Sequence, residues 1–217
     1  ELIGGYGIAY ELVMAAIEAG KHVVTANKAL LAVHGTEIFA AAHRKGVMVA
    51  FEASVAGGIP IIKALREGLT ANRIEWIAGI INGTTNFILS QMREKNWSFQ
   101  QALEMAQSLG YAEADPTADV EGFDAASKAA ILASLAFHSE VPVEQVYREG
   151  ITSVTPELMR TAQRDGNVIK LLAIAERIDA SKAGVEGVSV RVYPTLIPRT
   201  HPLGAVRGAF NAVFVEA

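Results

Sequence analysis

The chain has 217 residues, enough to bury a sizeable core in one large domain or one and a half ordinary ones. Its formal net charge is -4, and no run of lysine and arginine exceeds a pair, so neither nucleic acid nor an anionic membrane is an expected partner. Cysteine is absent, which excludes disulfides, thiolate metal sites and thiol nucleophiles and favours a cytoplasmic location.

Helix and strand patterns alternate in residues 1–51. Apolar residues at helical spacing predict a helix over 10–19, which ends at a glycine and leads into a short β-branched strand, HVVTAN, at 22–27. The same order follows with a helix over 36–45 and a strand over 47–55. Such alternation is typical of a parallel α/β sheet.

The pattern changes from residue 52 onwards. The segment AGGIP precedes an apolar helix over 61–69, and a strand is predicted over 74–81. The next segment, NGTTNFILSQM, receives no assignment. Further helices are predicted over 98–110, 124–137 and 156–166, and strands over 169–178, 188–197 and 208–216. Residues 52–217 therefore predict an α+β domain with a mixed or antiparallel sheet.

The chain is expected to be part of a longer protein. It opens on ELIGG without a methionine, and a strand is entered near its end. No signal peptide pattern is found, and Glu52 interrupts the longest apolar candidate for a membrane segment. We therefore expect no membrane contact, and small polar metabolites are the expected partners.

Two groups of residues suggest cofactor or metal sites only weakly. The stretch GGYG at 4–7 lacks the third glycine and the complete preceding strand of a dinucleotide fingerprint, so a tight turn is the alternative. The five histidines show neither helical i, i+4 pairing nor neighbouring carboxylates, and are interpreted as surface or hydrogen-bonded side chains.

Residues 110–128, GYAEADPTADVEGFDAASK, concentrate carboxylates ahead of a lysine. Asp124 and Lys128 are four residues apart on a predicted helix, which suits a surface ion pair but also a pair that binds a zwitterion. Lys28 follows a strand whose carboxyl end is a usual ligand position in a parallel sheet, with a solvated loop lysine as the alternative.

Six blocks in this chain resemble successive signatures of the homoserine dehydrogenase family, in the family's order. They are GKHVVTANKALLA, FEASVAGGIPIIKALREGL, GIINGTTNFIL, GYAEADPTADVEGFDAASK, IKLLA and HPLGAVRGAFNAVFV. The resemblance implies that the N-terminal part of a Rossmann-type NAD(P)-binding domain and the family's C-terminal end lie outside the chain. Residues 1–51 would then end that domain, and residues 52–217 would form the substrate and dimerisation domain.

The implied activity is NAD- or NADP-dependent reduction of aspartate 4-semialdehyde to L-homoserine by a homodimer, on the route to threonine, methionine and isoleucine. The resemblance implies substrate binding by Glu113 and Asp124, and general acid-base catalysis by Lys128. These 217 residues alone are expected to be inactive. The alternative is a non-catalytic dimerisation or amino-acid-sensing module, which the presence of Lys128 and Glu113 disfavours.

Further roles follow from the same resemblance. Lys28 is implied as a second active-site lysine near the cofactor and the substrate. The backbone of Gly4, Gly5 and Gly110 is implied near the nicotinamide. A structural monovalent cation, usually sodium, is implied at Glu52 and the carbonyls of Val55, Gly57 and Ile59. Asp115, Asp119 and Glu121 have no direct assignment and are interpreted as cap, loop and outer residues.

Overall fold

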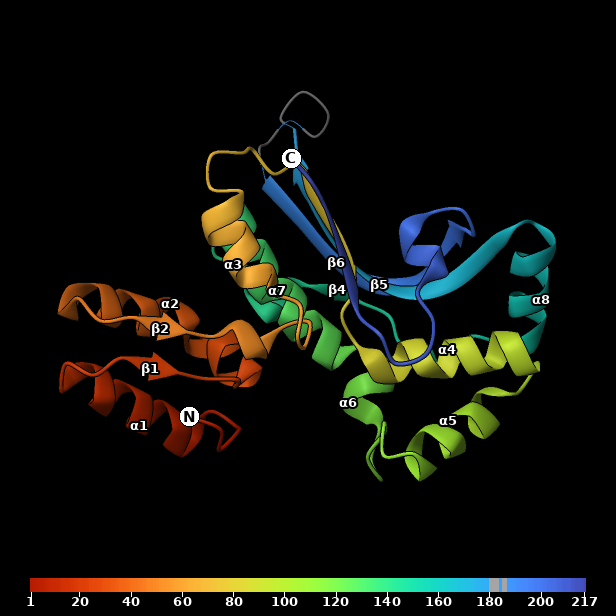
Figure 1. Cartoon of the computed structure of the whole chain (residues 1–217), viewed down its shortest axis with the longest axis horizontal. Helices are drawn as coiled ribbons and strands as arrows, with labels where there is room; N and C mark the ends of the chain where they lie inside the picture. Colours follow the sequence, from red (N-terminus) through yellow and green to blue (C-terminus); the bar gives the residue numbers. More distant parts are fainter. Residues whose placement is uncertain (180–183, 185–186) are drawn as a thin grey trace.

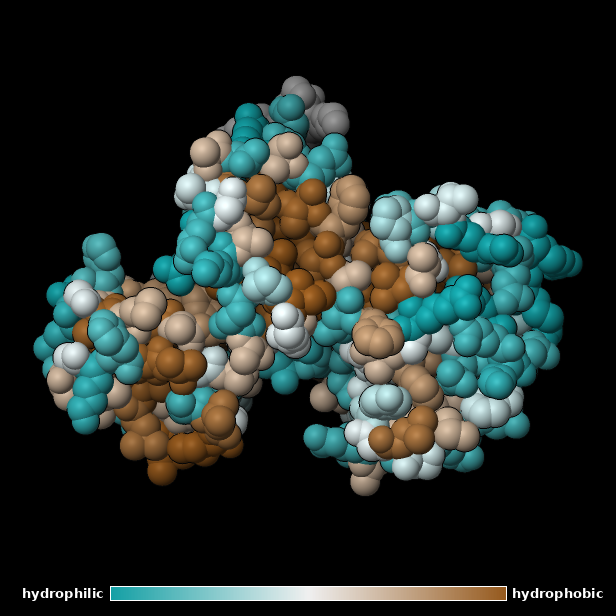
Figure 2. All heavy atoms as spheres, in the orientation of Figure 1, coloured by the Kyte–Doolittle hydropathy of each residue, from teal (hydrophilic) through white to brown (hydrophobic). Residues whose placement is uncertain are grey.

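The computed structural model describes residues 1–179, 184 and 187–217. Figure 1 shows a small N-terminal lobe of two helices and two strands beside a larger lobe built on a five-stranded sheet. In the space-filling view of Figure 2, an open notch separates the lower parts of the two lobes. The predicted α/β segment followed by an α+β domain is confirmed.

The small lobe follows the predicted order of helix and strand. It consists of α1 (Gly7–Glu18), β1 (Val23–Val24), α2 (Lys28–Lys45) and β2 (Val49–Ala50). The two strands are parallel, with Val23 opposite Val49. The apolar faces of both helices pack against them in a separate hydrophobic cluster.

Several boundaries in this lobe differ from the prediction, and α1 begins at Gly7 rather than at residue 10. Helix α2 begins earlier, at Lys28, because the Asn27 side chain accepts a hydrogen bond from a backbone amide of its first turn. The strand predicted over 47–55 ends at Ala50, and Glu52–Ser54 forms a 3₁₀ helix, η1. Only residues 25–27 separate β1 from α2, which places Lys28 just beyond the carboxyl end of that strand.

The large lobe is built on a mixed sheet with the strand order β4-β6-β5-β3-β7. Its strands are β3 (Trp76–Ile80), β4 (Tyr147–Arg148), β5 (Asn167–Ile178), β6 (Gly187–Pro198) and β7 (Ala212–Glu216). Neighbouring strands are antiparallel except β4 and β6, which are parallel. The last predicted strand is shorter than expected, since β7 begins at Ala212 rather than at residue 208.

The helices of the large lobe pack around this sheet. They are α3 (Ile61–Lys63) with its π-helical continuation η2 (Ala64–Gly68), α4 (Gly83–Lys95), α5 (Phe99–Ser108), α6 (Thr117–Val120), α7 (Phe123–Phe137), η3 (Val143–Gln145), α8 (Pro156–Arg164) and η4 (Pro202–Ala205). Helix α4 occupies the segment that received no assignment; Asn82 caps it by accepting a hydrogen bond from the Thr85 amide at 2.8 Å. The capping box of Ser98 and Gln101 begins α5, as predicted.

The two faces of the sheet contribute to different clusters. Helix α7 packs on β5 and β6 and forms the main hydrophobic core of the lobe on one face. On the opposite face, Leu203 of η4 packs with Ala78, Val168 and Leu172 in a smaller cluster. No helix in the described ranges combines the length and the apolar character needed to cross a membrane.

One lysine is buried in the sheet. Lys170 on β5 is 1% exposed, and its Nζ donates hydrogen bonds to Asn86 Oδ1 at 2.7 Å and to the Val206 carbonyl oxygen. Burial and the nearby Arg93 and Arg207 lower the pKa of Lys170 to about 8, although Glu94 opposes the shift. A neutral amine still has two N–H donors, so both hydrogen bonds can persist after deprotonation.

We expect Lys170 to give the protein a stability that rises with pH. Between about pH 8 and the ordinary lysine pKa of about 10.4, the unfolded chain binds more protons at this position than the folded chain, so the free energy of unfolding rises with pH. The free energy of unfolding of the wild type, minus that of the Lys170→Met variant, should therefore increase by about 2 to 3 kcal/mol from pH 7 to pH 10. Urea unfolding of both proteins at several pH values measures it, and a difference independent of pH would contradict the lowered pKa.

Candidate active site

The Asp124 carboxylate lies at the centre of a buried polar cluster at the start of α7. The helix follows Gly122, whose left-handed φ of 80° reverses the chain direction, and Asp124 is in the first turn, where the helix dipole stabilises a negative charge. Its side chain is only 9% exposed. A carboxylate buried to this extent needs charged or hydrogen-bonding partners, and three side chains provide them.

Lys128 is the first partner. Its Nζ lies 2.7 Å from Asp124 Oδ2 and also donates a hydrogen bond to the Ile81 carbonyl oxygen at 3.0 Å. The lysine side chain is 16% exposed, so the surface ion pair that the spacing also allowed is wrong. An ammonium group has three N–H donors, and these two contacts leave one for a ligand.

Lys28 is the second partner and comes from the other lobe. Its Nζ lies 3.1 Å from Asp124 Oδ1, so one carboxylate bridges two ammonium groups. As the first residue of α2, Lys28 occupies a position where the helix dipole disfavours a cation, and the contact with Asp124 offsets that cost. Lys28 therefore lies in a helix and not in the loop considered from the sequence, and its side chain remains 42% exposed.

Asn82 is the third partner, and sequence analysis did not identify it. Its Nδ2 donates hydrogen bonds to Asp124 Oδ2 at 2.9 Å and to Asp119 Oδ1 at 2.7 Å, and the residue is 4% exposed. The available signal was an asparagine followed by Gly-Thr-Thr after a strand, which is a typical helix cap. That signal predicts where α4 begins but not that the amide contacts two carboxylates.

These partners determine the ionisation of Asp124. Burial by itself raises the pKa of its carboxyl group, but the Lys128 ammonium, the Asn82 amide and the Lys28 ammonium together outweigh burial. The pKa of Asp124 therefore lies below its ordinary value. The carboxylate is ionised at neutral pH, and protonation in acid would remove the charge that holds both lysines.

Glu113 lies in the exposed loop between α5 and α6. Within the described chain its side chain makes no hydrogen bond or ion pair, so the structure does not bring it into the Asp124 cluster. The loop itself is fixed to α4, because Thr84 Oγ1 donates to the Tyr111 carbonyl oxygen at 2.6 Å and the Tyr111 ring lies 4.9 Å from that of Phe87. Glu113 is thus an unpaired carboxylate on a loop attached to the helix that Asn82 caps.

The glycines implied in cofactor binding form tight turns. Gly4 and Gly5 have φ values of 82° and 64°, and the Gly5 carbonyl oxygen accepts a hydrogen bond from Asn27 Nδ2 at 2.6 Å. Since Asn27 caps α2, this turn is held beside Lys28. Gly110, with a φ of 76°, directly follows α5 in the large lobe. The left-handed conformation at all three positions favours glycine.

The Glu52 side chain has a structural partner. Its two carboxylate oxygens accept hydrogen bonds from the backbone amides of Ile62 at 2.8 Å and Lys63 at 2.9 Å, so it stabilises the start of α3. In the following loop, Gly57 has a φ of 58° and lies near Asn211 Nδ2. Asn211 Oδ1 is buried and has no hydrogen-bond partner in the part of the chain that the structure describes. A buried amide oxygen of this kind is a suitable donor for a hard cation.

The other two residues implied at a cation site lie in the same loop. Val55 is fully buried, and Ile59 is half-buried with its carbonyl oxygen accepting a hydrogen bond from the Ile61 amide at 2.8 Å. The part of the chain that the structure describes contains no group of three histidine, aspartate or glutamate side chains arranged for a metal ion. A cation here would depend mainly on main-chain and amide oxygens.

The cluster combines groups suited to proton transfer to oxygen. Two ammonium groups flank one ionised carboxylate, and the third donor of Lys128 is free for the oxygen atom of a ligand. Asp119 adds a second carboxylate that shares Asn82, so both signs of charge are present for a zwitterion. The remaining acids of the segment have structural roles: Asp115 accepts hydrogen bonds from the amide and hydroxyl of Thr117, and Glu121 accepts one from Thr152.

Comparison with known proteins identifies the family. Residues 60–217 match the profile described as homoserine dehydrogenase, and residues 1–52 match its NAD binding domain. A homoserine dehydrogenase of Pseudomonas aeruginosa is 60% identical over 216 residues, which cover 100% of this chain and 48% of that protein. The chain therefore spans about half the length of this relative.

Solved structures of homoserine dehydrogenases are also similar to this chain. The crystal structure of a homoserine dehydrogenase from Thiobacillus denitrificans is 61% identical, with a TM-score of 0.94 over 100% of this chain and 49% of that one. A hyperthermophilic archaeal homoserine dehydrogenase in complex with NADPH is 30% identical, with a TM-score of 0.81 over 99% of this chain and 61% of that one. On the strength of the profile match, the sequence identity and the shared fold, this chain belongs to the homoserine dehydrogenase family.

Proposed function

We propose that the protein carrying this chain catalyses the reversible NAD(P)H-dependent reduction of L-aspartate 4-semialdehyde to L-homoserine, in the biosynthesis of threonine, methionine and isoleucine. The observation that carries the proposal is the cluster in which Asp124 holds Lys28 and Lys128 together, in a chain of the homoserine dehydrogenase family. A non-catalytic dimerisation module would have no need to bury this set of charges, because buried ionic groups are costly unless fully paired.

Lys128 is the proposed general acid. Reduction of an aldehyde requires a hydride at the carbon, which the nicotinamide supplies, and a proton at the oxygen. The alkoxide oxygen accepts its proton from the Lys128 ammonium, whose position is fixed by Asp124 and the Ile81 carbonyl. In the reverse direction the neutral amine removes the hydroxyl proton. Lys28 lies within the same charge cluster and stabilises negative charge on that oxygen.

The substrate also carries an ammonium and a carboxylate. Glu113 is an exposed carboxylate without a side-chain partner among the described residues, which makes it free to bind the substrate ammonium. Asp124 is already bound by two lysines. Its proposed roles are to contribute to substrate binding and to position Lys128.

The cofactor is proposed to bind against the small lobe. Residues 1–51 are the proposed end of the NAD(P)-binding domain, and residues 52–217 the substrate and dimerisation domain. The turn at Gly4 and Gly5 is fixed beside Lys28 through Asn27, which supports a position near the nicotinamide. Gly110 would approach it from the large lobe. The cytoplasmic location expected from the sequence stays a prediction.

The loop from Glu52 to Ile59 fits a structural monovalent cation. The donors available are the carbonyl oxygens of Val55, Gly57 and Ile59, and Asn211, whose Nδ2 lies near Gly57, adds an Oδ1 that has no hydrogen-bond partner among the described residues. Because the Glu52 carboxylate stabilises the start of α3, Glu52 would contribute its main-chain carbonyl. Such an ion would neutralise converging oxygen dipoles next to α3 and takes no part in proton transfer.

A homodimer is proposed through the face of the sheet that carries η4. Figure 2 shows hydrophobic atoms gathered in the middle of the large lobe. On the face with η4, Trp76 and Phe214 stack with ring centroids 5.4 Å apart and remain partly exposed beside Ile174. Strand β7 has one unpaired edge within the described sheet. Symmetric dimers commonly cover such surfaces.

Replacing Lys128 should abolish most activity in the full-length protein. We expect kcat for Lys128→Ala to fall by about 10²- to 10⁴-fold, the usual range for loss of a general acid. Lys128→Arg should be nearly as inactive, because a guanidinium does not release its proton and has a different shape. Steady-state kinetics with aspartate 4-semialdehyde and NADPH measures both variants.

The matched control is Lys45→Ala, which removes a lysine from a surface ion pair with Glu18 and should keep kcat within about twofold. Thermal unfolding should confirm that all variants are folded. If Lys128→Ala kept more than about a tenth of wild-type kcat, proton transfer by Lys128 would be excluded.

Substitutions of the two acids should separate binding from catalysis. Glu113→Gln should raise KM with little change in kcat, since it removes an anion that binds the substrate in the ground state and the transition state alike. Asp124→Asn should change both parameters, because the carboxylate also holds Lys128. An unchanged KM in Glu113→Gln would show that this loop does not bind the substrate ammonium.

Charging the exposed sheet face should dissociate the proposed dimer. We expect the full-length protein to sediment as a dimer at micromolar concentration, and Phe214→Lys to weaken association by about tenfold or more, since a buried unpaired charge costs at least about 1.4 kcal/mol. Leu158→Lys on α8 is the control, because Leu158 is also apolar and exposed but lies off this face. A wild-type monomer at that concentration, or equal effects of both variants, would contradict the proposal.

A further inference from the structure

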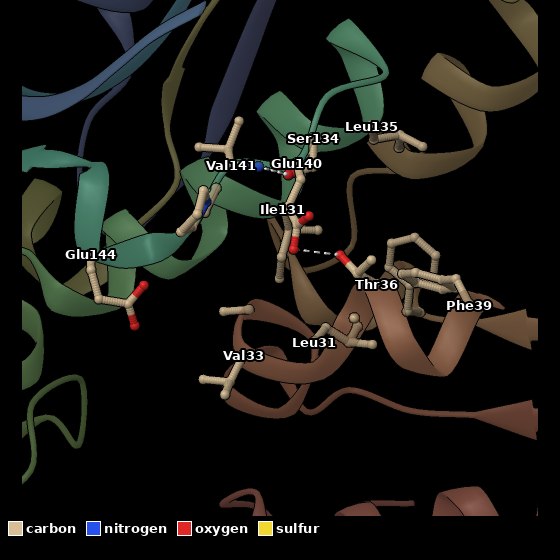
Figure 3. Close-up of a pocket in the computed structure, with 15 residues that line it drawn as sticks. Leu31, Val33, Thr36, Phe39, Ile131, Ser134, Leu135, Glu140, Val141 and Glu144 are labelled. Carbon is tan, nitrogen blue, oxygen red and sulfur yellow. Dashed lines mark hydrogen bonds between the residues drawn. The ribbon is translucent and has the colours of Figure 1, made fainter. Parts of the chain in front are cut away.

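A cavity of about 270 Å³ lies between the two lobes, away from the Asp124 cluster. Its walls come from α2, from α7 and from the segment that follows α7, as Figure 3 shows, and Phe51, between β2 and η1, also lines it. The apolar part of the lining consists mainly of Leu31, Phe39, Phe51, Ile131, Leu135 and Val141. Apolar pockets between domains are a common place for small-molecule sites.

The polar groups in this cavity are two hydroxyls and two carboxylates. Thr36 Oγ1 donates a hydrogen bond to Glu140 Oε1 at 3.1 Å, and Ser134 Oγ accepts one from the Val141 amide at 3.1 Å (Figure 3). Glu144 is the second carboxylate. No lysine, arginine or histidine is among the lining residues, and within the described chain neither glutamate forms an ion pair. The site therefore has an apolar body and an uncompensated negative charge at its edge.

We propose that this cavity binds a small apolar monoamine. The ammonium would donate a hydrogen bond to the Glu140 carboxylate, Glu144 would add negative charge at the rim, and the hydrocarbon part would lie between Phe39 and Ile131. The volume is somewhat less than twice that of a 150 Å³ cavity that binds benzene, so it suits a ligand of about ten non-hydrogen atoms. A ligand with a carboxylate is disfavoured, because the lining offers it no cation.

The absence of a lining cation separates this site from the proposed substrate site. The Asp124 cluster presents two lysines and suits an amino acid, whereas the cavity presents only acidic charge. Both sites lie along the same pair of helices, since Leu31 is one turn from Lys28 on α2 and Ile131 is one turn from Lys128 on α7. The amine would thus bind beside the catalytic helices without using the catalytic side chains, and the inference does not depend on the proposed function.

Phenethylamine is a suitable probe, measured by isothermal titration calorimetry with the full-length protein. It should bind saturably at one site per chain. Phenethyl alcohol, which has the same shape without the charge, should bind at least about tenfold more weakly, because charge-assisted hydrogen bonds are lost. Phenylalanine, which adds a carboxylate to the same amine, should bind to the cavity more weakly than phenethyl alcohol. Equal affinity for the amine and the alcohol, or the absence of amine binding, would overturn the proposal.

Variants locate the bound amine. The double substitution Glu140→Gln with Glu144→Gln should weaken phenethylamine by about tenfold or more while keeping the hydrogen bond to Thr36. Val33→Trp should abolish binding by filling the cavity, and it should fold normally because Val33 is 49% exposed.

Two single substitutions serve as controls. Glu104→Gln removes an exposed carboxylate from α5, and Glu113→Gln removes the carboxylate proposed to bind the substrate ammonium. Both should leave the amine affinity unchanged. If Glu113→Gln weakened the amine while the cavity variants did not, the amine would occupy the substrate site and the cavity proposal would be wrong.

Discussion

The arrangement of the site depends on one buried carboxylate. Asp124 is almost excluded from water at the start of α7, and an unpaired charge there would cost several kcal/mol. Its partners come from three elements: Lys128 from α7, Asn82 from the cap of α4, and Lys28 from the first turn of α2. The polar cluster is therefore satisfied only when helices from both lobes are in place. The polar cluster around Asp124 is complete only after the large lobe has folded and the small lobe has packed against it.

The ion pair between the lobes has a further consequence. Lys28 occupies a helix start that disfavours a cation, so the local sequence preference is violated there and Asp124 compensates. Local violations of this kind are expected at functional sites, where a charge is positioned for chemistry rather than for stability. The interface between α2 and α7 thus carries the charge cluster at one end and an apolar cavity further along, where Thr36 meets Glu140.

The acidic segment shows how one type of side chain acquires different roles. Asp115 fixes the turn before α6, and Glu121 accepts a hydrogen bond from Thr152, so both are structural. Asp119 and Asp124 share the Asn82 amide, and Glu113 pairs with no other side chain in the described ranges. These carboxylates are chemically almost identical in the sequence. Burial and the identity of the partner assign their roles, and both depend on segments distant in the chain.

The sequence alone determined the order of most elements, because helical periodicity, terminating glycines and the Ser98 capping box are local signals. It also identified the family, since six motif blocks in one order leave little room for another assignment. It missed α4 and the role of Asn82, and left open whether Asp124 and Lys128 form a surface pair. Only the tertiary structure decided these points, because the contacts of Asn82 with Asp124 and of Lys28 with Asp124 join residues far apart in the chain. Burial that makes such contacts strong is a property of the packed lobes and not of any local pattern.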